Sequence, residues 1–506
     1  MPTSGAHISE ARGTDMVRTG AEYIASLKDD RTVYMHGERV RDVTEHPALQ
    51  GAIRSIAGLY DLAAAPENRE VMTFPSPATG QPVNMAFLMP RTPEDLAARR
   101  RAHRLWADAT FGMMGRSPDH VAGFMTGFAL CPDLFAREDK RFGDHVVRHH
   151  AYLRDHDLYT AYVIIPPHID RSKPAHQQED PHLYAGVVEE RGDGIVVTGA
   201  QTLGTGAAIS NEIFVSSIVP LGPGDENYAL SLCVPTASPG LRMIVRRPYA
   251  ETAPSVYDYP LSSRFDETDA LVVFDRVFVP WERVFVYKNT ALTRAQFYET
   301  PAHVLGNHQA QIRFASKAQF LAGLALRIAE SIGVDKTPQT QTMLGELASY
   351  CAMAAGLVVA SETECVRDPR GFVSPSATYL YANNWLQATH YQTMLTYLRE
   401  LAGSGLLQVP ASYRDYLNPE IAGDLERYVR SPGLKSIERT KLYKLAWDLV
   451  GSEFAGRHQQ YELFYAGGRA QTTSVRVYRA FDFGAARAMV ERCLAGYDLP
   501  AAPPGG

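Results

Sequence analysis

The sequence predicts an α+β protein with helical regions at both ends and an antiparallel β-domain in the middle. Three observations predict this order: apolar residues at helical spacing up to about residue 158, short β-branched runs from about 159 to 288, and helical spacing again from about 289. The composition, with 45% hydrophobic and 21% charged residues over 506 positions, is typical of a globular protein with a large core. It excludes the fibrous, collagenous and disordered classes.

These changes in texture divide the chain into five segments. We expect a disordered N-terminus over 1–16, an N-terminal α-helical domain over 17–158, a middle β-domain over 159–288, a C-terminal helical bundle over 289–495 and a disordered tail over 496–506. No internal repeat is visible.

Each region has its own signal. Segment 93–115 is a helix with Leu96 and Trp106 as apolar anchors. The runs YVIIP, GIVVTG and ALVVFDRVFVPW follow one another without intervening helices, which predicts an antiparallel sandwich or open barrel. Apolar residues recur every fourth position from Phe320 to Ile332, which predicts one buried face of a long helix.

Charge and cysteine usage narrow the function. A formal net charge of −6 with no broad basic segment argues against nucleic-acid binding. The five cysteines lie far apart, so we expect reduced thiols, and neither a signal peptide nor a membrane-spanning run is visible. These patterns predict a cytoplasmic protein without membrane contact. His145 and His149 share a helix face, but we expect a solvated face rather than a metal site.

Several common catalytic motifs are missing from the sequence. It contains no phosphate-binding P-loop, no HExxH, no GxSxG and no complete GxGxxG. Neither a nucleotide hydrolase nor a self-contained NAD(P)H oxidoreductase is indicated.

Four other segments combine polar residues and glycines with apolar flanks. Arg99 and His103 lie one helical turn apart and suit an anionic substrate oxygen, although a surface basic patch has the same pattern. Tyr162 leads into the turn ending at Pro174, and small residues surround Thr202 and Thr205, where a ligand or a plain turn fits equally. Segment 451–468 can line an aromatic pocket or end a helix on the core.

The motifs MMGRSPD, HIDRSKP, GTGAAISNE and GSEFAGRHQQYELFYAG occur in this order. Together they resemble the 4-hydroxyphenylacetate 3-hydroxylase family, the oxygenase components of two-component, reduced-flavin-dependent phenol hydroxylases. The resemblance covers residues 17–495. It implies a fold similar to acyl-CoA dehydrogenases, with an N-terminal helical domain, a middle β-domain and a C-terminal four-helix bundle, in a homotetramer or a dimer.

The resemblance also implies roles for individual residues. Arg99 or Arg100 is the arginine beside the substrate phenol, while His103 and Tyr162 occupy positions where relatives carry Tyr and His, so either is a candidate base. The implied flavin contacts and the remaining substrate contacts are the following. Thr205 contacts the ring near N5 with Thr202 and Ser210 close by, Gly403 and Gly405 bind the phosphate-bearing half across a subunit interface, and Arg457 and Tyr465 lie beside flavin and phenol.

The implied reaction uses FAD as FADH2, together with O2. A flavin C4a-hydroperoxide hydroxylates a para-substituted phenol at the ortho carbon and gives a catechol. The missing nicotinamide motif implies a separate NAD(P)H:flavin reductase. Tyrosine-like, hydroxyphenylacetate-like and coumarate-like phenols remain open as substrates, either free or tethered to a carrier protein.

Two other readings remain. One is an acyl-CoA dehydrogenase-like or dehydratase-like flavoenzyme of the same fold. The similar 4-hydroxybutyryl-CoA dehydratase holds an iron–sulfur cluster with three cysteines and a histidine. This sequence has Arg99, His103 and Ala315 where those cysteines lie, so we expect no metal. The other reading is a flavin-binding protein without turnover.

Overall fold

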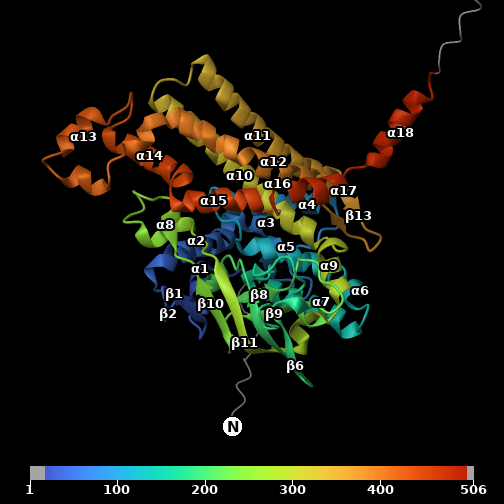
Figure 1. Cartoon of the computed structure of the whole chain (residues 1–506). Helices are drawn as coiled ribbons and strands as arrows, with labels where there is room; N and C mark the ends of the chain where they lie inside the picture. Colours follow the sequence, from blue (N-terminus) through green and yellow to red (C-terminus); the bar gives the residue numbers. More distant parts are fainter. Residues whose placement is uncertain (1–16, 466, 498–506) are drawn as a thin grey trace, which may run out of the picture.

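The computed structural model describes residues 17–465 and 467–497. The segments predicted to be disordered lie outside these residues, except for 496 and 497. Figure 1 shows a helical layer formed by the C-terminal half of the chain above a mixed layer of strands and helices.

The N-terminal region is mainly helical, as the sequence predicts, but it also contains two short strand pairs. Its helices are α1 (Gly20–Ser26), α2 (Pro47–Ala64), α3 (Arg69–Met72), α4 (Pro93–Ala109), α5 (Pro118–Ala129), α6 (Pro132–Phe135) and α7 (Lys140–His156). Its strands are β1 (Thr32–Met35), β2 (Glu38–Val40), β3 (Thr73–Pro75) and β4 (Pro82–Asn84).

Two sheets form the middle of the molecule. The first has the order β2-β1-β10-β11-β7-β6 and the second β12-β9-β8-β5. The strands that follow residue 159 are β5 (Thr160–Val163), β6 (Gly186–Arg191), β7 (Gly194–Gln201), β8 (Glu212–Val215), β9 (Leu230–Pro235), β10 (Leu241–Val245), β11 (Ala270–Pro280) and β12 (Val284–Tyr287). The short helix α8 (Ser262–Phe265) lies between β10 and β11.

Most strand pairs are antiparallel, as predicted, but two are not. β1 pairs in parallel with β10, with Val33 opposite Met243, and β5 pairs in parallel with β8. β1 therefore brings the N-terminal region into the larger sheet. Local spacing does not predict the pairing of β1 with β10, because β1 ends at Met35 and β10 begins at Leu241.

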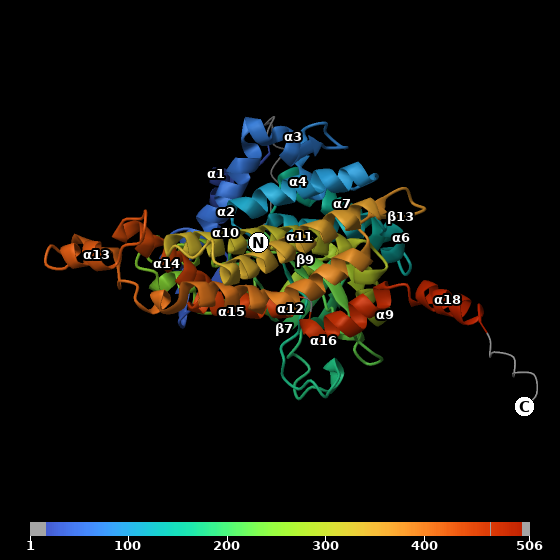
Figure 2. The same ribbon diagram turned by 90° about the horizontal axis from the view of Figure 1, so that it is seen from above.

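The three longest helices of the C-terminal region lie side by side in Figures 1 and 2, while its last helix projects away from them. Its helices are α9 (Thr290–Tyr298), α10 (Ala302–Ser331), α11 (Pro338–Thr363), α12 (Ala377–Ala402), α13 (Ala422–Tyr428), α14 (Ser436–Val450), α15 (Glu453–Phe464), α16 (Gly468–Gln471), α17 (Tyr478–Ala480) and α18 (Phe483–Leu494). The short strands β13 (Val366–Arg367) and β14 (Val373–Ser374) join α11 to α12. On the predicted face of α10, Leu324 and Ile328 are buried.

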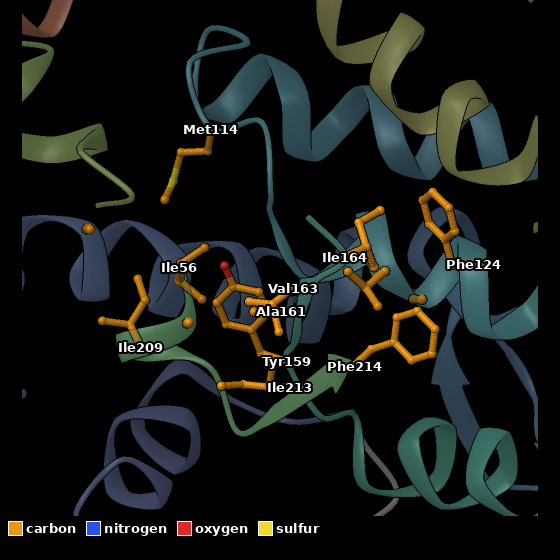
Figure 3. Close-up of a cluster of buried hydrophobic side chains, with 14 of the residues drawn as sticks. Ile56, Met114, Phe124, Tyr159, Ala161, Val163, Ile164, Ile209, Ile213 and Phe214 are labelled. Carbon is orange, nitrogen blue, oxygen red and sulfur yellow. The ribbon is translucent and has the colours of Figure 1, made fainter. Parts of the chain in front are cut away.

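One hydrophobic core joins these regions. Figure 3 shows Ile56 of α2, Phe124 of α5, Tyr159 and Phe214 of β8 in one cluster of buried side chains. The Tyr159 hydroxyl lies among apolar side chains but donates a hydrogen bond to the carbonyl oxygen of Arg116 at 2.6 Å. Tyr159, just before β5, thereby anchors the loop between α4 and α5.

Helix α11 has an unusual surface. By length and hydropathy alone it is long and apolar enough to cross a membrane, a test that the core helices of bundles also pass. It packs beside α10 and α12 (Figure 2). Only 17% of its most apolar stretch is buried, and Met353 and Val359 are exposed. Its outer face is therefore an unpartnered apolar surface in the single chain.

The prediction of a solvated histidine face on α7 is wrong. His145 and His149 are both buried, because β12 covers them: the His145 ring nitrogen Nδ1 lies 3.0 Å from the Val284 carbonyl oxygen. Burial lowers the pKa of many histidines in the fold. They are His103, His120, His145, His149, His150, His303, His308, His390 and His458.

This burial predicts sensitivity to acid. Unfolded histidines titrate near about pH 6.5, whereas burial lowers the pKa of His103 to about 4 and that of His150 to about 3. The unfolded chain therefore takes up protons first as the pH falls. The free energy of unfolding should decrease between about pH 6.5 and 4, by about 1.4 kcal/mol per pH unit for each such histidine. Denaturant unfolding at stepped pH measures this slope, and His150→Asn should reduce it; a flat profile would contradict it.

Candidate active site

Helix α4 presents Arg99 and His103 on one buried face. Thr92 begins the helix with a capping box: its hydroxyl accepts the Asp95 backbone N–H, and the Asp95 carboxylate accepts the Thr92 N–H. Four residues after Arg99, His103 points the same way. The two side chains are 0% and 2% exposed, so the alternative of a surface basic patch is wrong for them.

The Arg99 guanidinium is only partly satisfied by the protein. Its Nη1 donates to the carbonyl oxygens of Ala86 at 2.7 Å and Leu88 at 2.8 Å. Nε and Nη2 are buried and have no hydrogen-bond partner among the described residues. Burial lowers the pKa of Arg99 to about 10, so the group remains a cation near neutral pH. Such a cation with free N–H groups is an anion-binding group.

A carboxylate fixes His103. The ring nitrogen Nδ1 lies 2.8 Å from Oδ2 of Asp119, whose other oxygen accepts from Ser117 at 2.6 Å and Gln309 at 3.1 Å. Because the carboxylate accepts the Nδ1 hydrogen, Nε2 is left as an acceptor, and it is buried without a partner among the described residues. Burial lowers the pKa of His103 to about 4, which keeps the ring neutral at neutral pH.

Arg100 points elsewhere. Its Nε donates to both carboxylate oxygens of Glu362 on α11, at 2.8 and 3.0 Å. Of the two candidate arginines, only Arg99 therefore shares the helix face of His103.

A second cluster surrounds Arg116 in the loop before α5. Its guanidinium carbon lies 5.3 Å from the ring centre of Tyr162, and 5.1 Å from those of Tyr461 and Tyr465. These are cation–π distances. Arg116 belongs to the motif MMGRSPD, but its sequence context predicts no role for it. In the structure it contacts both predicted tyrosines, Tyr162 and Tyr465.

His120 connects the two clusters. Its ring lies 5.6 Å from that of Tyr162 and 6.4 Å from that of Tyr465. Its Nδ1 lies 3.0 Å from the Gln309 side-chain oxygen, and the Gln309 amide donates to Asp119. Hydrogen bonds thus connect His103 to His120 through Asp119 and Gln309, and ring contacts connect His120 to the two tyrosines.

A third group gathers around Asp269, just before β11. The Thr205 hydroxyl donates to Asp269 at 2.6 Å, and Arg457 of α15 binds the same oxygen at 2.9 Å. Burial raises the pKa of Asp269, but Arg457 and Arg246 outweigh this and hold it far below its usual range. The neighbouring Glu267 accepts the Arg116 backbone N–H at 2.6 Å and lies 3.6 Å from Arg457. It links this group to the tyrosine cluster.

Other predicted flavin contacts are less well placed. The Thr202 hydroxyl donates to the Ile165 carbonyl oxygen at 3.1 Å and stays accessible. Ser210 is fully buried, and its hydroxyl lies 3.1 Å from the backbone carbonyl oxygens of Ala207 and Glu212, so its flavin contact stays a prediction. Gly405 packs against Tyr443: an added Cβ would come within 2.5 Å of that ring. No contact in the described part of the chain connects Gly403 or Gly405 with Thr205, so their role stays a prediction.

Comparison with known proteins identifies the family. The family model described as 4-hydroxyphenylacetate 3-hydroxylase N terminal matches residues 19–286, and its C-terminal counterpart matches 293–495. The chain belongs to the 4-hydroxyphenylacetate 3-hydroxylase family. This confirms the resemblance read from the motifs.

Individual members of the 4-hydroxyphenylacetate 3-hydroxylase family agree along most of the chain. The 4-hydroxyphenylacetate 3-monooxygenase oxygenase component of Geobacillus sp. is 37% identical over 89% of this chain and 91% of its own. A Streptomyces globisporus monooxygenase that acts on a chlorinated hydroxyphenyl substrate bound to a peptidyl carrier protein is 34% identical over 97% of this chain and 93% of its own. The crystal structure of an oxygenase component (HpaB) with FAD and 4-hydroxyphenylacetate has a TM-score of 0.89 at 34% identity, covering 95% and 99% of the two chains.

These comparisons confirm the fold class, the enzyme class and the cofactor. The chain is the oxygenase component of a reduced-flavin-dependent phenol monooxygenase with an acyl-CoA dehydrogenase-like fold, and FAD and O2 are its cosubstrates. The term oxygenase component also implies a separate reductase component. Among the described residues, no group of His, Cys, Asp and Glu is placed to hold a metal ion.

Proposed function

We propose that the enzyme hydroxylates a para-substituted phenol, with the phenol oxygen bound between Arg99 and His103. The observation that carries this is the pair of unpartnered, fully buried nitrogens on one face of α4: Nη2 of Arg99 and Nε2 of His103. One is a donor on a cation and the other is a neutral acceptor. Together they match a hydroxyl group that must lose its proton and then be held as an anion.

Each residue then has a separate task. His103 accepts the phenol proton at Nε2, and Asp119 holds the ring and stabilises the imidazolium that forms. Arg99 stabilises the phenolate oxygen, which raises electron density at the ortho carbon. Tyr162 and Tyr465, together with Arg116, cover the approach to this pocket and exclude water.

Thr205, Leu203 and Arg457 fit the edge of a flavin. Leu203 has a positive φ of 59° and is 57% exposed, so the loop holds an apolar side chain outward at a strained position. Thr205 already donates its hydrogen to Asp269, so its hydroxyl has only acceptor capacity left. When bound, reduced flavin supplies an electrophilic oxygen derived from O2. The protein orients it and keeps the site dry.

The acceptor role of Thr205 gives a prediction about flavin binding. Reduced flavin carries a hydrogen on N5 and oxidised flavin does not, so an acceptor hydroxyl favours the reduced form. Thr205→Val should lower the preference for reduced over oxidised FAD by about tenfold, the value of one hydrogen bond. Anaerobic titration with both forms measures the ratio. Thr198→Val on β7 is the matched control, and an equal change in both variants would contradict the prediction.

The proposed function also implies a partner enzyme and an oligomeric state. We propose that an NAD(P)H:flavin reductase supplies the flavin, and that the enzyme is a homotetramer or a dimer. The exposed apolar face of α11 supports an oligomer, since an apolar surface of this kind is commonly covered by another subunit. The free cysteines are consistent with a reducing compartment, and we propose the cytoplasm.

The choice of phenol is the finer part of the proposal. We favour a tyrosine-like or phenylpropanoid phenol, because the family resemblance implies that His103 and Tyr162 stand where relatives carry Tyr and His. The test is a panel of free 4-hydroxyphenylacetate, 4-coumarate and tyrosine, and tyrosine loaded on a carrier protein, with a flavin reductase added. Catechol formation from one of them supports the proposal. No catechol from any phenol, with the enzyme saturated by reduced FAD, would overturn it.

A further inference from the structure

A second histidine faces the same interior as His103 and has no role so far. His308 lies on α10 and is 0% exposed. Its Nε2 lies 2.7 Å from Oε1 of Glu362, which also binds Arg100. Burial raises the pKa of Glu362, but His308 and Arg100 outweigh this and lower it, so the carboxylate is ionised. It therefore accepts the Nε2 hydrogen of His308.

This hydrogen bond fixes which nitrogen is basic. With its hydrogen on Nε2, the ring has a lone pair on Nδ1. That Nδ1 is buried and has no hydrogen-bond partner among the described residues. Burial lowers the pKa of His308, which keeps the ring neutral near pH 7. His308 is thus a neutral base with a carboxylate behind it.

The same arrangement occurs at His103, with Asp119 in place of Glu362. The two imidazole centroids are 6.2 Å apart and the rings meet edge to face at 80°. Two unpaired acceptors this deep in a core are costly unless a ligand donates hydrogen bonds to them. The free N–H groups of Arg99 belong to the same α4 face, and we expect the phenol to bind in the space that these atoms face.

We propose that His308 is a second catalytic base, which removes the ring proton from the carbon that is hydroxylated. This rests on the proposed binding of the phenol between Arg99 and His103. The two proton losses occur at neighbouring atoms, the phenol oxygen and the ortho carbon. Once His103 has taken the first proton it has no lone pair left, because Asp119 occupies its other nitrogen.

The proposed step moves two protons and restores the aromatic ring. Transfer of a hydroxyl group to the ortho carbon makes that carbon tetrahedral, with one hydrogen and one new oxygen. Nδ1 of His308 removes this hydrogen as a proton, and the C–H electron pair returns to the ring and restores aromaticity. His103 returns its proton to the original phenol oxygen, so a neutral catechol leaves. The reduced flavin would supply the two electrons that break the O–O bond, and it would be left oxidised. The other oxygen atom of O2 would leave as water, with one proton from His308 and one from the flavin.

The test is His308→Asn with a substrate deuterated at the ortho positions, chosen as a phenol that the wild type converts. Rapid proton removal in the wild type should give no isotope effect on catechol formation. The variant should form catechol about 10²-fold more slowly, the usual contribution of a general base, and should show a primary isotope effect. In His308→Ala, added imidazole should restore part of the rate.

His303→Gln is the matched control, because His303 lies on the same helix, is buried, and bonds to Tyr381 away from this space. If His308→Asn does not fold, Glu362→Gln is the alternative variant. It keeps the His308 imidazole but removes the carboxylate charge behind it, so it should also show the isotope effect. A folded His308→Asn enzyme with the wild-type rate and no isotope effect would overturn the proposal. An isotope effect of the same size in His303→Gln would overturn it as well. If the wild type itself forms no catechol, it is the proposed function that fails.

Discussion

Arg99→Ala should lower catechol formation by about 10²-fold or more while reduced flavin is still oxidised by O2. The reason is that Arg99 is a fully buried cation whose Nη2 has no partner among the described residues and is free for the proposed phenol. Without it, the phenolate has no counter-charge and the ortho carbon is less nucleophilic. Oxygen consumption should then appear as hydrogen peroxide instead of catechol.

The measurement is the ratio of catechol to consumed oxygen in a single turnover. Arg101→Ala is the matched control, since Arg101 belongs to the same helix but is exposed. Arg99→Lys, which keeps a positive charge, should retain more coupling than Arg99→Ala. Unchanged coupling in Arg99→Ala would remove Arg99 from the phenol site.

Glu462→Gln should destabilise the helical bundle by about 3 kcal/mol or more. The Glu462 carboxylate is buried and accepts from Arg313 at 2.9 Å, Lys317 at 2.8 Å and Gln387 at 2.7 Å. Burial lowers the pKa of Lys317 to about 8 even with this partner. Removing the carboxylate charge leaves two buried cations side by side.

The free energy of unfolding, from denaturant midpoints, tests this. The same helix provides the control: Glu453 pairs with Arg247 at 2.9 Å in an exposed position, so Glu453→Gln should cost less than about 1 kcal/mol. If the two variants lower the free energy of unfolding equally, the buried position of Glu462 adds nothing to the stability of the bundle.

The sequence predicted the parts of the site that depend on local spacing. Arg99 and His103 share a face because they are four residues apart in a helix with a strong N-terminal cap. The ordered motifs predicted the family and hence the fold. Neither needed any knowledge of long-range contacts.

The remaining parts depend on contacts between distant segments. Gln309 reaches Asp119 across 190 residues, and Glu362 reaches Arg100 across 262. Such pairs leave no periodic signal in one sequence. The error on α7 has the same origin, since the pattern around His149 looks solvated until β12 covers it.

The parallel pairing of β1 with β10 has a consequence for synthesis on the ribosome. The hairpin of β1 and β2 is too small to be stable alone, and its partner strand ends at Val245. The edge of β1 that pairs with β10 therefore stays unpaired until more than two hundred further residues have been synthesised. During this interval the exposed edge of β1 can pair with a wrong strand. If the gene were split near residue 158, β1 and β10 would lie on different fragments, and the sheet could form only after the two fragments associate.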